Sequence, residues 1–143
     1  MDNKVTFCYW SIRGLAERIR MIMEYVGLPY EQKLYSGENR DAWFKEDKPK
    51  LIEKNPAVTL PYLIDGEECI SESDAIIVHV IHKANKPELL GRNSTEQVRI
   101  ATMMGIIRDL HGRYIGLVYG RDFKDKPFEE AKAAALETFK PYL

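Results

Sequence analysis

The stretch VTFCYWSIRGLAERIRMIMEYVG, residues 5–27, decides the fold because it places a strand directly before a helix. Side chains alternate over residues 5–9 with the two-residue period of a strand. Apolar side chains then recur at the spacing of one buried helical face, at Leu15, Ile19, Ile22, Met23 and Val26. Gly27 and Pro29 supply the cap and the breaker that end this predicted helix.

Beyond this stretch, the pattern predicts a second strand, a loop, a hairpin and another helix. Residues 30–35 form the second strand, and residues 36–56 are polar enough to predict a long loop with one helical turn around Trp43. Residues 61–70 predict a hairpin, because a glycine after Asp65 can supply the positive φ of a tight turn. A strand–helix–strand start implies a right-handed crossover and a parallel pair, to which the hairpin adds antiparallel strands.

The strand pattern disappears after residue 85. Residues 86–93 contain proline and glycine and are the predicted linker. Two amphipathic helices follow: the first is capped by Ser94, and the second begins near Lys126. Two such helices make a poor domain alone, so we expect the sequence to stop inside a helical domain. The predicted organisation is an α/β domain over 1–85, a linker over 86–93 and an incomplete all-helical domain over 94–143.

Composition excludes several classes of protein. The net charge is -1, from 21 basic and 22 acidic side chains, which argues against a nucleic-acid partner. No stretch approaches the roughly 18 consecutive apolar residues of a membrane span. Cys8 and Cys69 lie far apart and outside any zinc-ligand spacing. We therefore expect a cytoplasmic protein without membrane or nucleic-acid partners.

The common catalytic and metal-binding motifs are absent from the sequence. It contains no GxSxG, no HExxH, no glycine-rich phosphate loop and no EF-hand. His79 and His82 share a helix face but have no third ligand at matching spacing, so a packed or solvent-facing pair is favoured over a metal site.

Three segments, in the right order along the chain, resemble the Mu class of cytosolic glutathione transferases. Residues 9–16, YWSIRGLA, resemble the YWxIRGLA opening of that class. Residues 60–66, LPYLIDG, resemble its NLPYLIDG segment, and residues 72–76, ESDAI, resemble its QSNAI segment. The resemblance implies a thioredoxin-like glutathione-binding domain followed by an all-helical domain, within which this chain ends.

The implied reaction is conjugation of the glutathione thiolate to small apolar electrophiles, as in detoxification. Glutathione is then a co-substrate, no prosthetic group is implied, and the expected partner is a second copy in a homodimer. A free thiol has a pKa of about 8.5 and is mostly protonated at neutral pH, so the protein must favour the anion. Tyr9 matches the family tyrosine that donates a hydrogen bond to the sulfur. Such a bond contributes about 1.5–3 kcal/mol, equivalent to about one or two pKa units.

The resemblance also implies how the rest of glutathione is held. Glu72 and Ser73 match residues at the γ-glutamyl end, and Leu60 before a cis-proline, Pro61, presents its backbone to the cysteinyl residue. The remaining implied contacts are Trp10, Leu15, Trp43, Lys48 and Thr59, of which Trp10, Trp43 and Lys48 surround the glycyl carboxylate.

This chain departs from the Mu pattern at three of these positions. Glu72 replaces a glutamine and can pair directly with the ammonium group of glutathione. Thr59 replaces an asparagine, which puts its side-chain contact in doubt. The loop before Trp43 is shorter than in Mu proteins, so Lys48 aligns only with a shift of one residue.

In the helical part, Asp109 aligns with an acidic residue that reaches the glutathione of the neighbouring subunit, and Tyr119 aligns with a tyrosine of the electrophile pocket. Two other functions stay open. The first is a non-catalytic binding or scaffold protein, since family members continue well past residue 143. The second is a Sigma-like glutathione-dependent isomerase, because Arg13 and Glu17 also suit that class.

Overall fold

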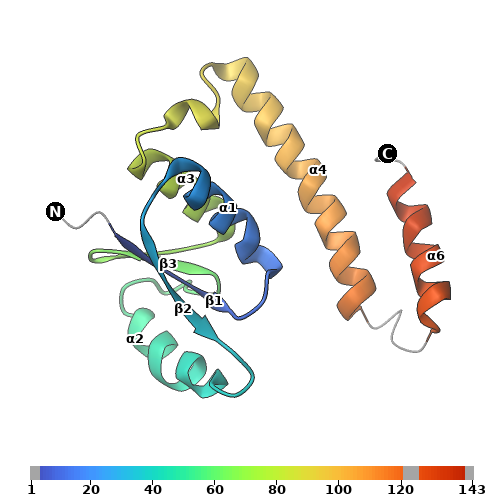
Figure 1. Ribbon diagram of the computed structural model, residues 1–143, viewed down its shortest axis with the longest axis horizontal. Helices are drawn as coiled ribbons and strands as arrows, with labels where there is room; N and C mark the ends of the chain where they lie inside the picture. The colour runs from blue at the N-terminus through green and yellow to red at the C-terminus, as the bar shows by residue number, and fades with distance from the viewer. Residues whose placement is uncertain (1–3, 121–125, 141–143) are drawn as a thin grey trace. The chain divides into compact units, whose positions relative to one another are not determined.

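The computed structural model describes residues 4–120 and 126–140 of the chain (Figure 1). The chain divides into two compact units, Met1–Leu89 and Leu90–Leu143. The first unit is an α/β fold and the second is helical, as the sequence predicts.

The first unit is built on a four-stranded sheet with the strand order β2-β1-β3-β4. Its strands are β1 (Val5–Trp10), β2 (Tyr30–Tyr35), β3 (Tyr62–Asp65) and β4 (Glu68–Ser71). β1 pairs in parallel with β2 and antiparallel with β3, and β3 pairs antiparallel with β4, which confirms the predicted topology. Asp65 pairs with Glu68, so the tight turn consists of Gly66 and Glu67, and the positive φ of 58° falls on Gly66.

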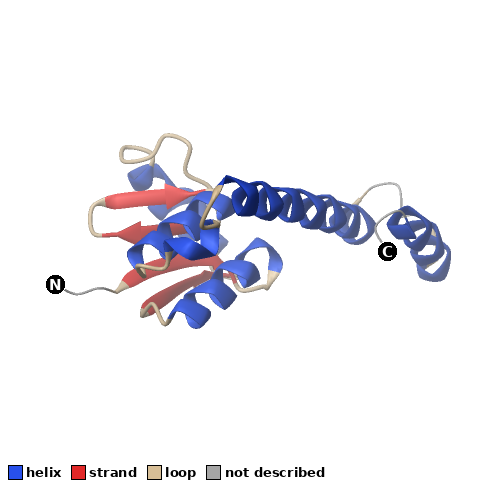
Figure 2. Cartoon of the chain, turned by 90° about the horizontal axis from the view of Figure 1, so that it is seen from above, coloured by secondary structure: helices blue, strands red, loops and turns tan. Residues whose placement is uncertain are grey.

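One face of the sheet is covered by α1 (Glu17–Val26) and α3 (Ser73–Lys83). A short 3₁₀ turn, η1 (Gly14–Ala16), precedes α1, and another, η3 (Pro87–Leu90), follows α3. The core on this face combines inward side chains of β1 and β3 with one stripe from each helix, including Phe7, Leu63, Ile19, Met23, Ile76 and Val80. Figure 2 distinguishes the strands from the helices that pack along them.

The other face carries a second cluster, around Trp43. The predicted long loop over residues 36–56 is partly wrong here, because it contains a π-helical segment, η2 (Ala42–Asp47), and a short helix, α2 (Lys48–Leu51). Trp43 stacks on Tyr62 with ring centroids 5.5 Å apart, so a single large aromatic anchor holds a segment that has no apolar periodicity of its own.

The second unit contains α4 (Ser94–Tyr119) and α6 (Phe128–Phe139), which lie against each other. α4 is capped by Asn93 and not by Ser94: the Asn93 side chain accepts the Glu96 N–H at 3.0 Å. Residues 141–143 of the predicted helical domain lie outside the described residues. Neither α4 nor any other helix in the described ranges is long and apolar enough to cross a membrane.

Gly27 offers a test of the cap that ends α1, because its φ is 70° and no atom would obstruct a Cβ there. We expect Gly27→Ala to lower the free energy of unfolding by about 1–2 kcal/mol, purely through the left-handed backbone. Urea unfolding followed by tryptophan fluorescence measures this change, since both tryptophans lie in the first unit.

Gly37→Ala is the matched control, because Gly37 has equally open space and no positive φ. We expect that variant to match or slightly exceed the wild type in stability. Equal losses from both substitutions would contradict the assignment of the cost to the Gly27 backbone.

Candidate functional site

The Tyr9 hydroxyl lies beneath the turn that joins β1 to η1. It accepts a hydrogen bond from the Leu15 N–H at 3.2 Å, and the Tyr9 side chain is only 6% exposed. Gly14 passes directly over it with a φ of 41°, and a Cβ at that position would lie 2.7 Å from the Tyr9 oxygen. Only glycine therefore fits this approach without displacing the ring.

The Tyr9 hydroxyl can donate a hydrogen bond to a ligand. Within the described residues it accepts one hydrogen bond and donates none, so its O–H is available to a ligand. The Leu15 N–H polarises the hydroxyl and strengthens it as a donor. The hydroxyl also sits at the N-terminal end of the helical segment formed by η1 and α1, where the partial positive charge favours an anion.

Leu15 is predicted as part of the buried face of the helix, and this prediction is wrong. Its side chain is 39% exposed, because residues 14–16 form a 3₁₀ turn ahead of α1. Its backbone N–H, and not its side chain, makes the contact with Tyr9.

Trp10, Trp43 and Lys48 come together on the side of the sheet that carries η2. Trp10 packs edge-on against Tyr35 at 6.0 Å, and the Lys48 Nζ lies 6.0 Å from the centroid of the Trp43 ring. Trp43 is only 3% exposed, so its side chain acts first as a core residue that seats η2. Lys48 is half-buried and keeps its ammonium group at the edge of this cluster.

A chain of polar contacts, which spacing in the sequence does not signal, fixes η2 to the sheet. The Lys33 ammonium contacts the Asp47 carboxylate at 2.6 Å, the Tyr35 hydroxyl donates to that carboxylate at 2.6 Å, and the Tyr62 hydroxyl lies 2.8 Å from that of Tyr35. Burial raises the pKa of Tyr35, and the Asp47 charge adds to this shift. Burial opposes the Asp47 charge, but the hydrogen bonds from Lys33 and Tyr35 hold the pKa of Asp47 below its ordinary value.

Neither cysteine has the lowered thiol pKa of an activated nucleophile. Burial raises the pKa of Cys8 to about 11, despite a hydrogen bond from Tyr62 that lowers it. Cys69 is half-buried, and its pKa is also raised by burial. A thiol with a raised pKa holds little thiolate at neutral pH, so neither sulfur is activated.

Thr59, Leu60 and Pro61 lead into β3, and the Leu60–Pro61 peptide bond is cis, as expected. Thr59 is exposed and Leu60 is half-buried. In the described ranges, the N–H and C=O groups of Leu60 make no hydrogen bond, so both are available to an extended peptide.

Glu72 and Ser73 form the start of α3. Glu72 has φ 72° and ψ 121°, a conformation that costs a residue other than glycine on the order of 1–3 kcal/mol. Its side chain is exposed and makes no capping hydrogen bond to the helix. Ser73 is buried at the start of the helix. The first N–H groups of a helix have no carbonyl partner within it, so the start of α3 can bind an anion.

Asp109 and Tyr119 both lie on α4 in the second unit, and both are exposed.

His79 is paired with a carboxylate: its Nε2 lies 2.8 Å from Asp65, which also pairs with Lys83 at 2.9 Å. Residues 4–120 and 126–140 contain no group of three or more acidic, histidine or cysteine side chains that could hold a metal ion.

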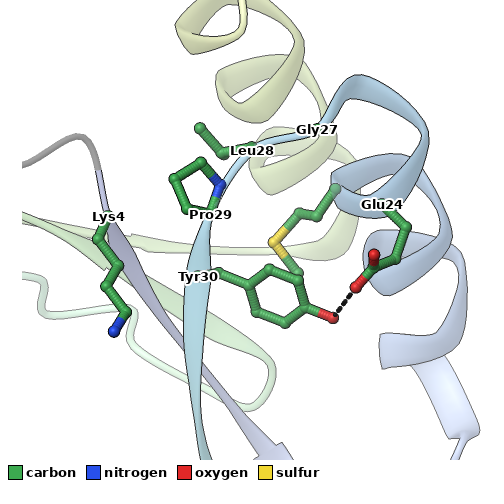
Figure 3. A pocket seen from close by; sticks show the side chains of 7 residues that line it. Lys4, Glu24, Gly27, Leu28, Pro29 and Tyr30 are labelled. Carbon is green, nitrogen blue, oxygen red and sulfur yellow. Dashed lines mark hydrogen bonds between the residues drawn. The ribbon is translucent and has the colours of Figure 1, made fainter.

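A separate surface pocket lies at the opposite end of the sheet, next to the start of β1 (Figure 3). Its lining includes Lys4, Leu28 and the pair formed by Tyr30 and Glu24, whose side chains are joined by a 2.9 Å hydrogen bond. None of the predicted site residues lines this pocket.

Comparison with known proteins gives consistent matches. Residues 5–82 match the family model of the glutathione S-transferase N-terminal domain. Glutathione S-transferase Mu 4 of Mus musculus is 37% identical over 125 residues, which cover 84% of this chain and 55% of that protein. Glutathione S-transferase Mu 5 of Homo sapiens is 37% identical over 134 residues, covering 88% of this chain and 59% of that protein. The chain therefore spans just over half the length of these curated relatives.

The fold is also matched among solved structures. The glutathione S-transferase from Ascaris lumbricoides superimposes with a TM-score of 0.69 at 22% identity, over 97% of this chain and 65% of that chain. At this identity the likeness concerns the fold alone.

The burial of Cys8 leads to a labelling prediction. At about pH 8, a thiol of pKa about 11 is only about 0.1% thiolate, so we expect iodoacetamide to leave Cys8 unmodified in the folded protein. Mass spectrometry of native and urea-unfolded samples measures the labelling. In Cys69→Ser, native labelling should disappear, and denaturant should restore it at Cys8 alone. Rapid native labelling of Cys8 would contradict its burial.

Proposed function

The chain belongs to the glutathione S-transferase family, and we propose that it binds glutathione at the Tyr9 end of the first unit and activates its thiol. In the proposed reaction the thiol loses its proton to water. The resulting thiolate forms a bond to an electrophilic carbon of a small apolar substrate, and the leaving group departs with its bonding electrons.

The observation that carries this proposal is the Tyr9 hydroxyl. It receives a hydrogen bond from the Leu15 N–H at 3.2 Å and keeps its own proton for a ligand. A sulfur anion placed there gains a charge-assisted hydrogen bond, which contributes about 1.5–3 kcal/mol. The same bond gives much less to the protonated thiol, so the hydroxyl favours ionisation.

The other predicted residues supply the remaining contacts of the proposed site. Glu72 would pair with the ammonium group of the γ-glutamyl end, while the Ser73 hydroxyl and the first N–H groups of α3 would bind its carboxylate. Leu60, flanked by Thr59 and Pro61, would pair its open backbone groups with the cysteinyl residue.

At the other end of glutathione, Lys48 would pair with the glycyl carboxylate and Trp10 would contact the same group. Trp43 would act indirectly, since its buried ring seats the segment that carries Lys48.

The finer assignments follow the Mu-class relatives. We infer a homodimer in which Asp109 reaches the glutathione of the partner subunit and Tyr119 contributes to the electrophile pocket, with a detoxifying role. Exposed apolar side chains along α4, among them Met103 and Ile107, support association through that helix. The two free thiols support a reducing, cytoplasmic setting.

Tyr9→Phe tests the proposal. We expect the dissociation constant for glutathione to change little, the pKa of the bound thiol to rise by about one unit or more, and conjugation to fall on the order of 10–100-fold. Far-ultraviolet absorbance of the thiolate against pH and turnover of a generic aryl halide are the measurements. Tyr25→Phe, which changes an exposed tyrosine of α1, is the control and should match the wild type.

An unchanged thiol titration in Tyr9→Phe would mean that another group ionises the sulfur. Retention of the wild type on a glutathione resin without turnover of the aryl halide would instead support a binding protein and reject the enzyme.

The Glu72 backbone yields a second prediction. Glu72→Gly relieves the positive φ and should raise the free energy of unfolding by about 0.5–1 kcal/mol, while glutathione affinity falls several-fold because the carboxylate is lost. Urea unfolding and calorimetric titration measure the two effects. Glu68→Gly, in an ordinary strand conformation, should lose about 0.5–1 kcal/mol and keep its affinity. A loss of stability in Glu72→Gly would show that its backbone is unstrained.

A further inference from the structure

The turn over Tyr9, residues 11–13, is held through its backbone and not through its side chains. Ile12 is 52% exposed and the side chains of Ser11 and Arg13 are also exposed, so no buried side chain holds the turn down. The Ser11 N–H donates to the Tyr35 carbonyl at 2.6 Å, and the Ile12 N–H donates to the Trp10 carbonyl at 2.7 Å. At the end of the turn, the Arg13 carbonyl accepts from the N–H groups of Ala16 and Glu17, both at 3.1 Å. The Ile12 carbonyl, in the middle of the turn, is held by a side-chain contact from another element.

That contact comes from Arg20 on α1. Its Nη1 donates to the Ile12 carbonyl at 3.3 Å and to the Glu17 carboxylate at 3.1 Å. Its Nε donates to the Gln32 side-chain oxygen on β2 at 2.8 Å, and its guanidinium lies 5.8 Å from the centroid of the Phe7 ring. The side chain is 18% exposed, so these partners hold it in one place. One guanidinium thus connects the turn to α1, β1 and β2.

We infer that Arg20 is a positioning residue for the Tyr9 hydroxyl, an inference that rests on the proposed function. Arg20 holds the Ile12 carbonyl, and the chain that follows places Gly14 and the Leu15 N–H on the Tyr9 oxygen. If the turn lifts, the Leu15 donor leaves the hydroxyl, which then stabilises a thiolate less well.

A positioning role for Arg20 should affect ionisation of the bound glutathione thiol without affecting the affinity for glutathione. The proposed contacts to the two ends of glutathione come from Glu72, Ser73 and Lys48, which lie on other elements than the turn. Loss of Arg20 should therefore weaken ionisation of the bound thiol and leave binding nearly intact. Lysine cannot replace it fully, because one ammonium nitrogen cannot reproduce the separate Nε and Nη1 contacts to Gln32 and Ile12.

Arg20→Met in the full chain is the test. We expect the pKa of the bound glutathione thiol to rise by about half to one unit and turnover of an aryl halide to fall about 3–10-fold, with the dissociation constant for glutathione within about 2-fold. Arg20→Lys should recover only part of this loss. Lys4→Met is the matched control: it removes a cation that pairs with Glu31 on β2 at 2.6 Å, far from the turn, and should change none of these three values.

A double-mutant cycle with Tyr9→Phe tests whether Arg20 acts through Tyr9. In the Tyr9→Phe background, Arg20→Met should raise the thiol pKa no further, because the hydroxyl is already gone. Additive shifts, or an Arg20→Met variant with a wild-type thiol titration, would overturn the inference. If Arg20→Met does not fold, Gln32→Met removes the Nε partner, and the same two criteria apply to it.

The two proposals fail differently. A wild type that neither binds glutathione nor ionises its thiol would reject the proposed function itself. A wild type that does both, with a Tyr9→Phe shift but no coupling to Arg20, would reject the positioning role alone.

Discussion

The hydrogen bond from the Leu15 N–H to the Tyr9 hydroxyl is the contact on which the rest of the site depends. To form it, the chain must leave β1, turn tightly and bring its backbone within reach of an aromatic ring that is almost fully buried. This close approach requires glycine at position 14, since a Cβ there would lie 2.7 Å from the Tyr9 oxygen. The 3₁₀ geometry of η1 follows as well, because it turns a backbone donor toward the ring before α1 begins.

On the opposite face of the sheet, packing and hydrogen bonds hold the polar segment η2 in place. Trp43 supplies the buried area, while Asp47 ties the segment to Tyr35 and, through it, to Tyr62. A buried polar chain of this kind is stabilising only when every member is paired, since an orphaned carboxylate or hydroxyl costs more than the pair contributes. The segment that carries Lys48 therefore has one well-defined arrangement.

The sequence predicts the architecture well because hydrophobic periodicity determines it. The alternation in residues 5–9, the helical stripe ending at Gly27 and the hairpin over residues 61–70 each have a local cause, and each is confirmed, with Gly66 and Glu67 as the two turn residues. The misses have long-range causes. The helical segment at Ala42–Asp47 depends on stacking between residues 43 and 62, and the exposure of Leu15 depends on its backbone contact with Tyr9. The Arg20 contacts join residues from three elements, and no spacing along the chain reveals them.

The strand order places β2 at one edge of the sheet, where unpaired backbone groups could recruit a strand from another molecule. This edge is guarded by charge: Glu31 and Lys33 are both exposed, and each is neutralised by a partner within its own unit, Lys4 and Asp47. The opposite edge, β4, is only four residues long. Protection of both edges suppresses growth of the sheet by strand addition.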